Sequence, residues 1–476
     1  MRLATSGRAP IKFATSLALG LAGLTCDSST GVEVGPPAAV EVVSGQDQNA
    51  VVGQELPASL VARVLDADDR PISGRAVKFV VTSGGGALSP QDVLTDENGA
   101  ATTRWTLGTK TDPQRAEAQV LDPTTGEKLL SVEFRATAGA GGAAKLTKTS
   151  GDNQTAAAGT AVEIRPAVTV SDQYDNPLKD EQINWRIFGD PGTVADDDVA
   201  TSKTDANGVA VLPGPWTLGQ RVGTHTLTAT LVSHEPLTYT ATVTFTATAV
   251  VGPPARLGFV VPPSTTATNG ERLPRQPVVQ LQDQAGNPVK LADVVVQITR
   301  IPGSGPPPAE YFGDTTKLVI LNDTTKTNSD GVATFTGTTL NGPVGDGYRL
   351  GFTAPMTSTL SSDPITLLRG QPYKLVILVP AQGATRGSTF AVQPMIQAED
   401  AGGNSTTIAQ CVNARISIGA TLTGITQLSG VGDTFDFPNL GVSADTSPGT
   451  YTITYNTGCC VPDALLIPAS QEIQVQ

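Results

Sequence analysis

The sequence predicts an all-β chain of four tandem antiparallel β-sandwiches that together form an extended rod. Three observations support this prediction. Landmark residues recur at matching intervals, apolar and polar residues alternate along short stretches, and turn-forming residues separate those stretches. The 476 residues include 50 glycines and 35 prolines, but only 3 Trp, 7 Tyr and 12 Phe. This composition is typical of short strands joined by tight turns.

A glycine opens each repeat, and an acidic turn ends eighteen residues after it. The opening glycines are Gly53, Gly159, Gly270 and Gly387. The acidic turns are Asp66–Pro71, Asp172–Pro177, Asp283–Pro288 and Asp400–Ser405. From one repeat to the next, both landmarks step by the same 106, 111 and 117 residues. Landmarks that drift together indicate duplicated domains, because a repeat of this length is a self-contained unit.

A second turn and a tryptophan motif support the same register. The second turn occurs as Thr95-Asp-Glu-Asn-Gly99, Thr204-Asp-Ala-Asn-Gly208 and Thr327-Asn-Ser-Asp-Gly331. The tryptophan motif occurs as Trp105-Thr-Leu-Gly108 and Trp216-Thr-Leu-Gly219. The Asn-Gly pairs at 98–99 and 207–208 are expected to supply the positive φ angles of a tight hairpin. The fourth repeat lacks both motifs and is the most diverged.

Within each repeat, side chains alternate with a period of two. In the second repeat Ile183, Trp185 and Ile187 alternate with Asn184 and Arg186. Alternation, turn spacing and repeat length predict immunoglobulin-like sandwiches, and Trp185 falls where such sandwiches often bury a tryptophan. We expect four domains, at 38–142, 143–254, 255–370 and 371–476. The joints between them are short and rich in Pro and Gly, which limits their swing.

The N-terminus predicts export. Arg2, Arg8 and Lys12 precede an apolar stretch over 13–24 that is too short to span a membrane. Residues 1–26 are therefore expected to be a signal peptide and 27–37 a polar linker. No later stretch is apolar enough to cross a bilayer. We expect a protein of the cell envelope, tethered to the outer membrane, displayed at the cell surface, or secreted.

The segment Leu21-Ala-Gly-Leu-Thr-Cys26 resembles the cleavage box of bacterial lipoproteins. The resemblance implies lipidation of Cys26, with the polar residues 27–31 as a membrane-proximal tether. The three residues before Cys26 are Gly23, Leu24 and Thr25, which depart from the usual box. Ordinary signal cleavage, with Cys26 lost in a discarded leader, is the alternative.

Charge and residue usage exclude several function classes. The chain has 31 Lys and Arg against 44 Asp and Glu, a net charge of −13. Without a basic cluster, this balance argues against nucleic acid and anionic lipid as partners. The chain has two histidines, His225 and His234, and no cysteine between Cys26 and Cys411. We expect His225 at an exposed strand position and His234 in a turn, and we expect no enzymatic activity.

The acidic turns have two interpretations. Asp and Asn side chains cap backbone donors in turns, and this structural role is favoured for every acidic turn here. The other interpretation is calcium, for which the weak candidates are Asp66, Asp68 and Asp69, and Asp196, Asp197 and Asp198. Their spacing does not match an EF-hand loop. The sequence therefore predicts no obligatory cofactor.

The order of an apolar strand, Asp-x-x-x-Asn-Pro, a second strand and Thr-Asp-x-Asn-Gly resembles the group-1 bacterial immunoglobulin-like domain of intimins and invasins. The second repeat matches best, through 172–177 and 204–210. The resemblance covers 38–370 well and 371–476 loosely. It implies exported, non-catalytic modules that act as an adhesion or presentation scaffold. The expected partner is an unknown protein or glycan on a surface, with membrane contact only through the N-terminal lipid.

An insertion in the third repeat suggests an alternative function. Thr204 and Thr327 are 123 residues apart, twelve more than the repeat step, which places an insertion around 301–312. Function is often added to rigid sandwiches by such loops, but a neutral surface insertion is the favoured interpretation here. The alternative is a soluble glycan- or ligand-binding module that uses loops of the third and fourth repeats. An enzyme is a distant third.

The fourth repeat holds the remaining cysteines, Cys411, Cys459 and Cys460. Export to an oxidising compartment favours pairing. A bond between adjacent cysteines closes a strained ring, so we expect Cys411 to bond to Cys459 or to Cys460. The third thiol could pair between chains. We expect a strand to begin at Cys411 and run to Ile418.

Overall fold

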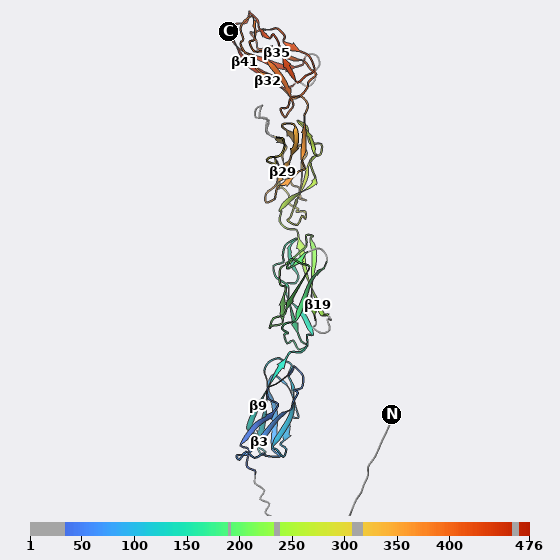
Figure 1. Ribbon diagram of the computed structural model, residues 1–476, viewed down its shortest axis with the longest axis vertical. Helices are drawn as coiled ribbons and strands as arrows, with labels where there is room; N and C mark the ends of the chain where they lie inside the picture. The colour runs from blue at the N-terminus through green and yellow to red at the C-terminus, as the bar shows by residue number, and fades with distance from the viewer. Residues whose placement is uncertain (1–33, 189–191, 233–238, 307–317, 459–465) are drawn as a thin grey trace, which may run out of the picture. The chain divides into compact units, whose positions relative to one another are not determined.

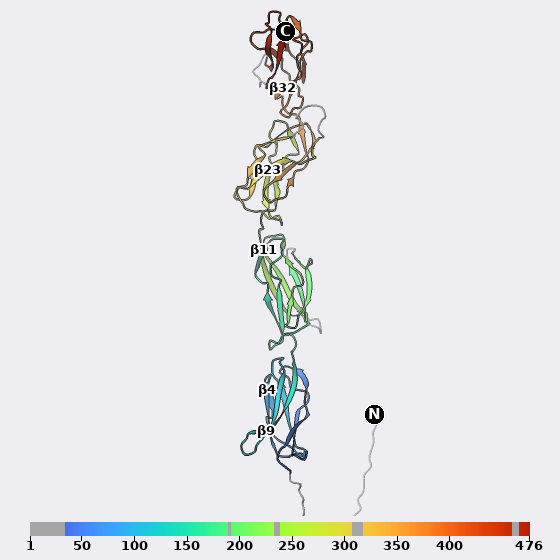
Figure 2. The same ribbon diagram turned by 90° about the vertical axis from the view of Figure 1, so that its left-hand side faces the viewer.

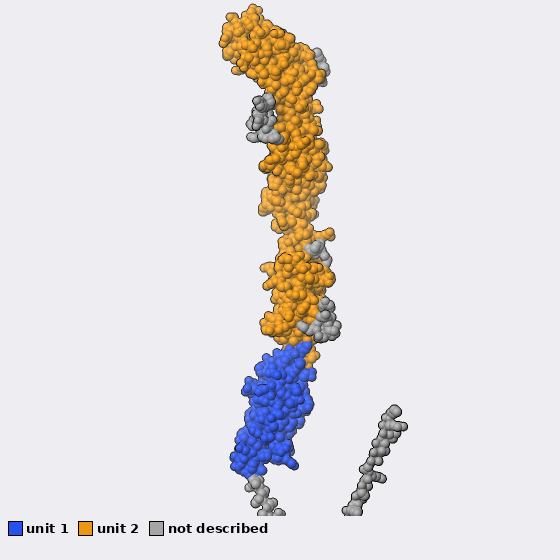
Figure 3. Space-filling view, viewed as in Figure 1, with its two compact units in different colours: residues 1–142 blue, residues 143–476 orange. Residues whose placement is uncertain are grey.

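The computed structural model describes residues 34–188, 192–232, 239–306, 318–458 and 466–476. It divides the chain into two compact units, unit 1 (1–142) and unit 2 (143–476), which Figure 3 shows in different colours. Every regular element among the described residues is a β-strand, so the predicted all-β class is confirmed.

Unit 1 holds two β-sheets that face each other across an apolar core (Figures 1 and 2). Its strands are β1 (Ala39–Ser44), β2 (Gln48–Val51), β3 (Leu60–Leu65), β4 (Ala76–Ser83), β5 (Gly86–Ser89), β6 (Asp92–Leu94), β7 (Ala100–Leu107), β8 (Gln114–Leu121) and β9 (Lys128–Gly139). One sheet has the order β1-β3-β7-β5, and the other has the order β2-β9-β8-β4-β6. Alternation along β3 buries Leu60, Ala62 and Val64 in the core, as their period of two predicts.

The first part of unit 2 repeats this arrangement over 143–250. Its strands are β10 (Lys145–Ser150), β11 (Gln154–Ala157), β12 (Ala167–Ser171), β13 (Gln182–Phe188), β14 (Thr193–Val194), β15 (Val199–Lys203), β16 (Val209–Val211), β17 (Trp216–Thr217), β18 (Gly223–Val232) and β19 (Tyr239–Val250). The larger sheet, β11-β19-β18-β13-β15, has the same topology as the larger sheet of unit 1. The other strands form the sheets β10-β12-β16 and β14-β17.

The remaining strands of unit 2 form two further sets of sheets. Over 256–368 they are β20 (Arg256–Val261), β21 (Thr266–Thr268), β22 (Val278–Gln282), β23 (Val295–Arg300), β24 (Val319–Leu321), β25 (Thr324–Lys326), β26 (Val332–Thr334), β27 (Thr339–Asn341), β28 (Gly345–Tyr348), β29 (Leu350–Thr353), β30 (Leu360–Ser361) and β31 (Ile365–Leu368). Over 374–475 they are β32 (Lys374–Val379), β33 (Ser388–Thr389), β34 (Met395–Glu399), β35 (Val412–Ile416), β36 (Leu422–Thr423), β37 (Gln427–Leu428), β38 (Thr434–Asp436), β39 (Gly441–Val442), β40 (Gly449–Thr457) and β41 (Ala469–Val475). No pairing between named strands joins one of these two sets to the other within the described residues.

Most pairings between the named strands are antiparallel, as the sequence predicts, and three are parallel. In unit 1, β1 pairs antiparallel with β3, but β2 pairs parallel with β9 in the opposite sheet. Gly45 lies between β1 and β2 with a φ of 91°, which lets the chain turn sharply from one sheet to the other. Two strands of unit 2 repeat this parallel pairing: β11 pairs parallel with β19, and β21 pairs parallel with β31.

Buried aromatic and aliphatic side chains fill the space between the sheets. Trp105, Trp185 and Trp216 are all buried, as is expected for the largest apolar side chains. Trp185 packs against Phe245 with ring centroids 6.0 Å apart, and its Nε1 donates a hydrogen bond to Ser202 Oγ at 2.8 Å. The buried apolar clusters of unit 2 lie within 146–249, 257–367 and 375–475. Each of the last three predicted repeats thus contains a core of its own.

One predicted strand is shorter than expected. The run that we predicted to extend from Cys411 to Ile418 forms β35 over Val412–Ile416 only. Ile418 is fully exposed and precedes Gly419, whose φ is 100°. The strand ends there because the chain enters a turn that glycine permits.

Candidate functional site: the acidic turns and the joints

Each acidic turn is built around one buried carboxylate. In unit 1 the backbone amides of Asp68 and Arg70 donate to Oδ1 of Asp66, at 3.0 and 2.9 Å. The amide of Asp66 in turn donates to the carbonyl of Arg70, and Asp69 has a φ of 59°. The Asp66 side chain therefore replaces the hydrogen bonds that the tight turn would otherwise leave unmade.

Unit 2 repeats this turn three times around Asp172, Asp283 and Asp400. The donors to their Oδ1 atoms include the amides of Tyr174 and Asn176, of Asn287, and of Gly402 and Asn404, at 2.7–2.9 Å. The residue with positive φ occupies the same place in all four turns: Asp69, Asp175, Gly286 and Gly403. All four central aspartates are buried, with at most 2% of their surface exposed.

The second oxygen of the carboxylate reaches back to the chain that enters the repeat. Oδ2 of Asp66 accepts the amide of Gly35 at 3.1 Å, and Oδ2 of Asp283 accepts the amide of Gly252 at 3.0 Å. Oδ2 of Asp400 accepts the amide of Gly370 at 2.9 Å. These glycines belong to the Pro/Gly segments that the sequence predicted as linker and joints. One aspartate therefore closes its own turn and also fixes the segment that leads into its repeat.

These hydrogen bonds favour the ionised forms of Asp66 and Asp283. The Arg70 amide lowers the pKa of Asp66 most, and the Gly35 amide and the Arg70 guanidinium lower it further, so the pKa stays below its ordinary value despite burial. For Asp283, burial alone would raise the pKa. Hydrogen bonds from Gly252 and Asn287 outweigh this effect and lower the pKa of Asp283.

Within unit 2, the asparagine of the acidic turn contacts the preceding repeat. Nδ2 of Asn287 donates to the carbonyl of Gln220 at 2.8 Å. Gln220 directly follows the Trp216-Thr-Leu-Gly219 motif. In the next joint Nδ2 of Asn404 donates to the carbonyl of Gly342 at 2.9 Å, and its Oδ1 accepts the amide of Val344 at 2.9 Å. The asparagine at this turn position therefore bonds to the preceding repeat in both joints.

The opening glycine turn of the third repeat forms the other side of this second joint. Asn269, directly before Gly270, is buried, and its Oδ1 accepts the amide of Gly342 at 2.8 Å. A Cβ on Gly370 would collide with the carbonyl of Asn269, and a Cβ on Gly402 would collide with the Asn269 side chain. Glycine is required at these two positions because backbone and side chain from adjacent repeats lie in direct contact.

The Thr-x-x-x-Gly turns are also structural. Oγ1 of Thr95 donates to the Ile72 carbonyl at 2.6 Å and accepts the Arg75 amide at 2.8 Å. Gly99 has a φ of 71° and Gly208 has a φ of 73°, whereas neither preceding asparagine has a positive φ. The predicted positive φ at both residues of each Asn-Gly pair was therefore wrong for the asparagine. The Asp96 side chain accepts the amides of residues 98 and 100 instead, which holds a turn with a single left-handed residue.

The structure does not gather the calcium candidates into a cation site. Asp66 accepts backbone amides, and Asp68 forms an ion pair with Arg70. Near the second candidate set, Asp196 has a φ of 69°, and Asp197 Oδ1 accepts the Asp198 amide. Across the described residues, no three His, Cys, Asp or Glu side chains are grouped so that they could hold a metal ion.

His225 is buried rather than exposed, which corrects the prediction. Only 7% of its surface is exposed, and its Nε2 lies 3.0 Å from the carbonyl of Arg221. His225 has the same parity along β18 as Leu227 and Ala229, which both face the core. That parity was the signal that could have placed it correctly. His234 lies outside the described residues.

The cysteine and leader predictions fall largely outside the described residues. Cys411 is disulfide-bonded. Cys459 and Cys460 lie in 459–465, and Cys26 lies in 1–33, so neither the identity of the Cys411 partner nor the lipid is tested. Of the insertion around 301–312, residues 301–306 are described. No helix of the described residues is long and apolar enough to cross a membrane.

Comparison with known families supports the fold of the third repeat. The family model of the SMCHD1 Ig-like domain 6 matches residues 252–368, so this stretch has an immunoglobulin-like fold. The match covers less than half of the chain. No curated protein matches the sequence.

The chain is also similar to solved structures at low identity. It is 10% identical to E. coli alpha-2-macroglobulin, with a TM-score of 0.25, and the match covers 93% of this chain but only 40% of that protein. It is 13% identical to a tetra-tandem repeat in the extending region of a large adhesion protein, with a TM-score of 0.30 and coverage of 91% and 98%. It is 18% identical to the D0-D1 domain of intimin, with a TM-score of 0.17 and coverage of 44% and 95%.

Proposed function

We propose that this chain is an exported, non-catalytic scaffold of the cell envelope that presents a binding surface or mediates adhesion. The observation that supports this proposal most is that one acidic turn forms hydrogen bonds both to the joint and to the preceding repeat. Asp283 bonds to Gly252 in the joint, while Asn287 of the same turn bonds to Gln220 of the preceding repeat. Asp400 and Asn404 repeat this arrangement. A scaffold requires joints that restrain its modules, and each of these two turns supplies two restraints at one place.

The strength of each joint follows from the number of its hydrogen bonds. A single hydrogen bond contributes about 1 kcal/mol, and a bond to a carboxylate contributes more. The Asn404 side chain makes two bonds to the preceding repeat, and Asp400 adds the bond to Gly370. We infer that the joints restrain bending without preventing it, as suits a surface protein that must reach a partner. That partner is an unidentified protein or glycan on a surface.

The proposed location rests on the first 26 residues of the sequence. A short apolar segment after three basic residues directs export, and Cys26 is the proposed lipid attachment site. Cell fractionation of wild type and Cys26→Ser tests the anchor. We expect wild type in the membrane fraction and the variant in the soluble fraction, with both folded. An unchanged distribution, or a mature N-terminus other than residue 26, would contradict the anchor.

Protease treatment of intact cells tests the display of the scaffold. We expect an added protease to remove the repeats from whole cells while a periplasmic marker survives. Protection of the repeats until the outer membrane is opened would contradict display at the surface. The result of this experiment is independent of the result for the anchor, because a lipidated protein can face either side of the membrane.

A further inference from the structure

A groove of about 680 Å³ lies on the outer face of the larger sheet of the second repeat. Four neighbouring strands line it: β15, β13, β18 and β19. Its lining includes Asn184, Arg186, Phe188, Thr228, Thr230 and Thr242. The volume lies within the range of small-molecule sites, and the lining combines an apolar surface with hydroxyl and amide groups.

An aromatic ring and a cation lie together in this groove. Phe188 is 54% exposed, which is unusual for a phenylalanine in this chain, where most large apolar side chains fill the cores. The Arg186 guanidinium lies 5.1 Å from the centre of the Phe188 ring, a cation–π contact that orders both groups. Among the described lining residues, Arg186 is the only charged one, and none carries a carboxylate. The described part of the groove therefore offers one cation beside an exposed ring.

Hydroxyl groups extend the groove away from the ring. Strand pairing places Thr228 opposite Arg186 and Thr230 opposite Asn184. Oγ1 of Thr230 lies 3.2 Å from Oγ1 of Thr242 on the next strand, and Oγ1 of Thr228 donates to the Arg186 carbonyl at 3.2 Å. These rows of hydroxyl groups can both donate and accept hydrogen bonds at the sheet surface.

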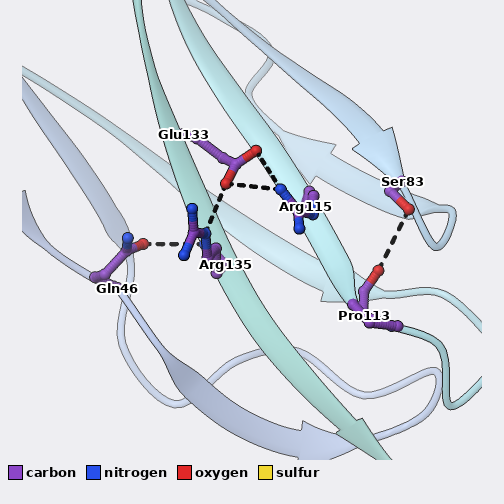
Figure 4. A network of polar contacts seen from close by, with 6 residues as sticks. All are labelled: Gln46, Ser83, Pro113, Arg115, Glu133 and Arg135. Carbon is purple, nitrogen blue, oxygen red and sulfur yellow. Dashed lines mark hydrogen bonds and ion pairs between the residues drawn. The ribbon is translucent and has the colours of Figure 1, made fainter.

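The same face of unit 1 has different chemistry. Phe79 pairs with Ala118 as Trp185 pairs with Ala229, so the two sheets can be compared position by position. The positions of Thr226, Thr228, Thr244 and Thr246 are held in unit 1 by Arg115, Glu117, Glu133 and Arg135. There Glu133 bonds to both arginines, at 2.9 and 2.6 Å (Figure 4). Glu117 pairs with Lys128 at 3.0 Å. Unit 1 therefore pairs the charges at these four positions with one another or with Lys128, whereas the second repeat has threonines there and carries Arg186 beside them.

We propose that the groove of the second repeat binds an acidic oligosaccharide, a chain of pyranose rings that carry carboxylates. The exposed ring of Phe188 offers a face for the apolar side of a sugar ring, and Arg186 offers its guanidinium to the carboxylate. The threonine hydroxyls and Asn184 are placed to bond the sugar hydroxyls. The net negative charge of the protein does not prevent binding of an acidic ligand, because salt at physiological concentration screens charges that lie more than about 8 Å from the groove. The site is independent of the joints and of the loops of the third and fourth repeats.

The experiment is calorimetric titration of the full chain with two matched probes, a 1,4-linked tetramer of glucuronic acid and cellotetraose. The two differ in the carboxylate at C6. We expect the acidic tetramer to bind and the neutral one to bind at least about tenfold more weakly, because a charged hydrogen bond is lost. Arg186→Gln should lower the affinity for the acidic tetramer to the same degree. Phe188→Ala should lower the affinity for both probes.

The controls are an exposed aromatic and an exposed arginine elsewhere in the chain. Tyr373→Ala and Arg415→Gln should leave both affinities unchanged, since neither residue lines the groove. Circular dichroism and thermal unfolding should match wild type for all four variants. The proposal is overturned if the acidic tetramer does not bind. It is also overturned if the two probes bind equally, or if neither groove variant changes the affinity for the acidic tetramer.

Discussion

The side-chain amide of Asn287 donates a hydrogen bond to the backbone carbonyl of Gln220, although 67 residues separate them in the chain. Asn287 belongs to the turn that Asp283 organises, and Asp283 also binds the amide of Gly252 in the joint. The turn, the joint and the end of the preceding repeat are therefore held by residues of one short motif. A change at one of these residues should loosen the joint and leave the cores intact.

Replacement of Asn287 tests this relationship. Asn287→Ala removes one hydrogen bond across the joint, worth about 1 kcal/mol, and two side-chain contacts to Asp283. We expect faster deuterium exchange in the peptide that contains Val251 and Gly252, with unchanged exchange in β18 and β23. Asn207→Ala, in an exposed turn of the second repeat, is the matched control and should change nothing at the joint. Equal exchange in Asn287→Ala and wild type would count against the joint as described.

A larger side chain at Gly402 should open the joint between the third and fourth repeats. A Cβ there would collide with Asn269, whereas a Cβ on Gly430 would meet no atom within 4 Å. Arg369 directly precedes Gly370, so trypsin can report on the joint by cleavage after Arg369. We expect Gly402→Ala to be cut there several-fold faster than wild type, with the two resulting pieces stable. Gly430→Ala should be cut at the wild-type rate. The description of this joint fails if both variants behave alike.

Acid should weaken the acidic turns. The folded-state pKa values of Asp66 and Asp283 are lowered, so these groups bind fewer protons when folded than when unfolded. Their stabilisation is therefore fully present above the unfolded pKa, about 4, and is lost as the pH falls through the lower folded value. We expect the melting temperature to decrease as the pH falls below about 4.

Asp283→Asn serves to assign part of this pH dependence. The variant should have a lower midpoint at pH 7 and a smaller decrease on acidification, because the amide cannot ionise. Asp363→Asn, at an exposed position, should show the wild-type pH profile. A wild-type profile in Asp283→Asn would mean that the ionised form of Asp283 does not support the turn.

The disulfide of the fourth repeat can be mapped directly. Cys411 is bonded, and we predict Cys459 or Cys460 as its partner. Closure of a loop of about 50 residues contributes roughly 3–4 kcal/mol in the chain-entropy model. Peptide mapping without reductant should find Cys411 joined to 459 or 460, and Cys411→Ser should lower the midpoint of this repeat. A 459–460 bond in the wild type would show that the pairing is wrong.

The sequence predicts the turns better than it predicts their role. Asp66 and its three counterparts were recognised as turn-forming residues because Asp and Asn satisfy backbone donors locally, over two to four residues. The bond from Asp283 to Gly252 spans 31 residues, and that from Asn287 to Gln220 spans 67, so no local rule reveals them. Repetition of both landmarks with the same steps was the available signal that they act together.

The outer face of the second repeat was not predicted. Alternation separates the two faces of a strand and places Trp185 inside and Arg186 outside, as observed. It does not show which outward residues from four strands lie together, since this depends on strand order and register. The groove became visible only when β13 was found between β15 and β18. The sequence also shows that His225 lies on the same side of its strand as Leu227, but we assigned His225 to the exposed side.

Small-angle scattering of the mature chain tests the central claim most directly, namely that restrained joints make this chain an extended scaffold. A domain of about 100 residues has a radius of gyration of about 13 Å, so four in a line should reach a maximum dimension of roughly 130–150 Å. We predict that dimension for wild type, and a broader distribution of dimensions for the double variant Asn287→Ala, Asn404→Ala. A maximum dimension under about 90 Å would indicate that the repeats collapse onto one another, and it would contradict the account.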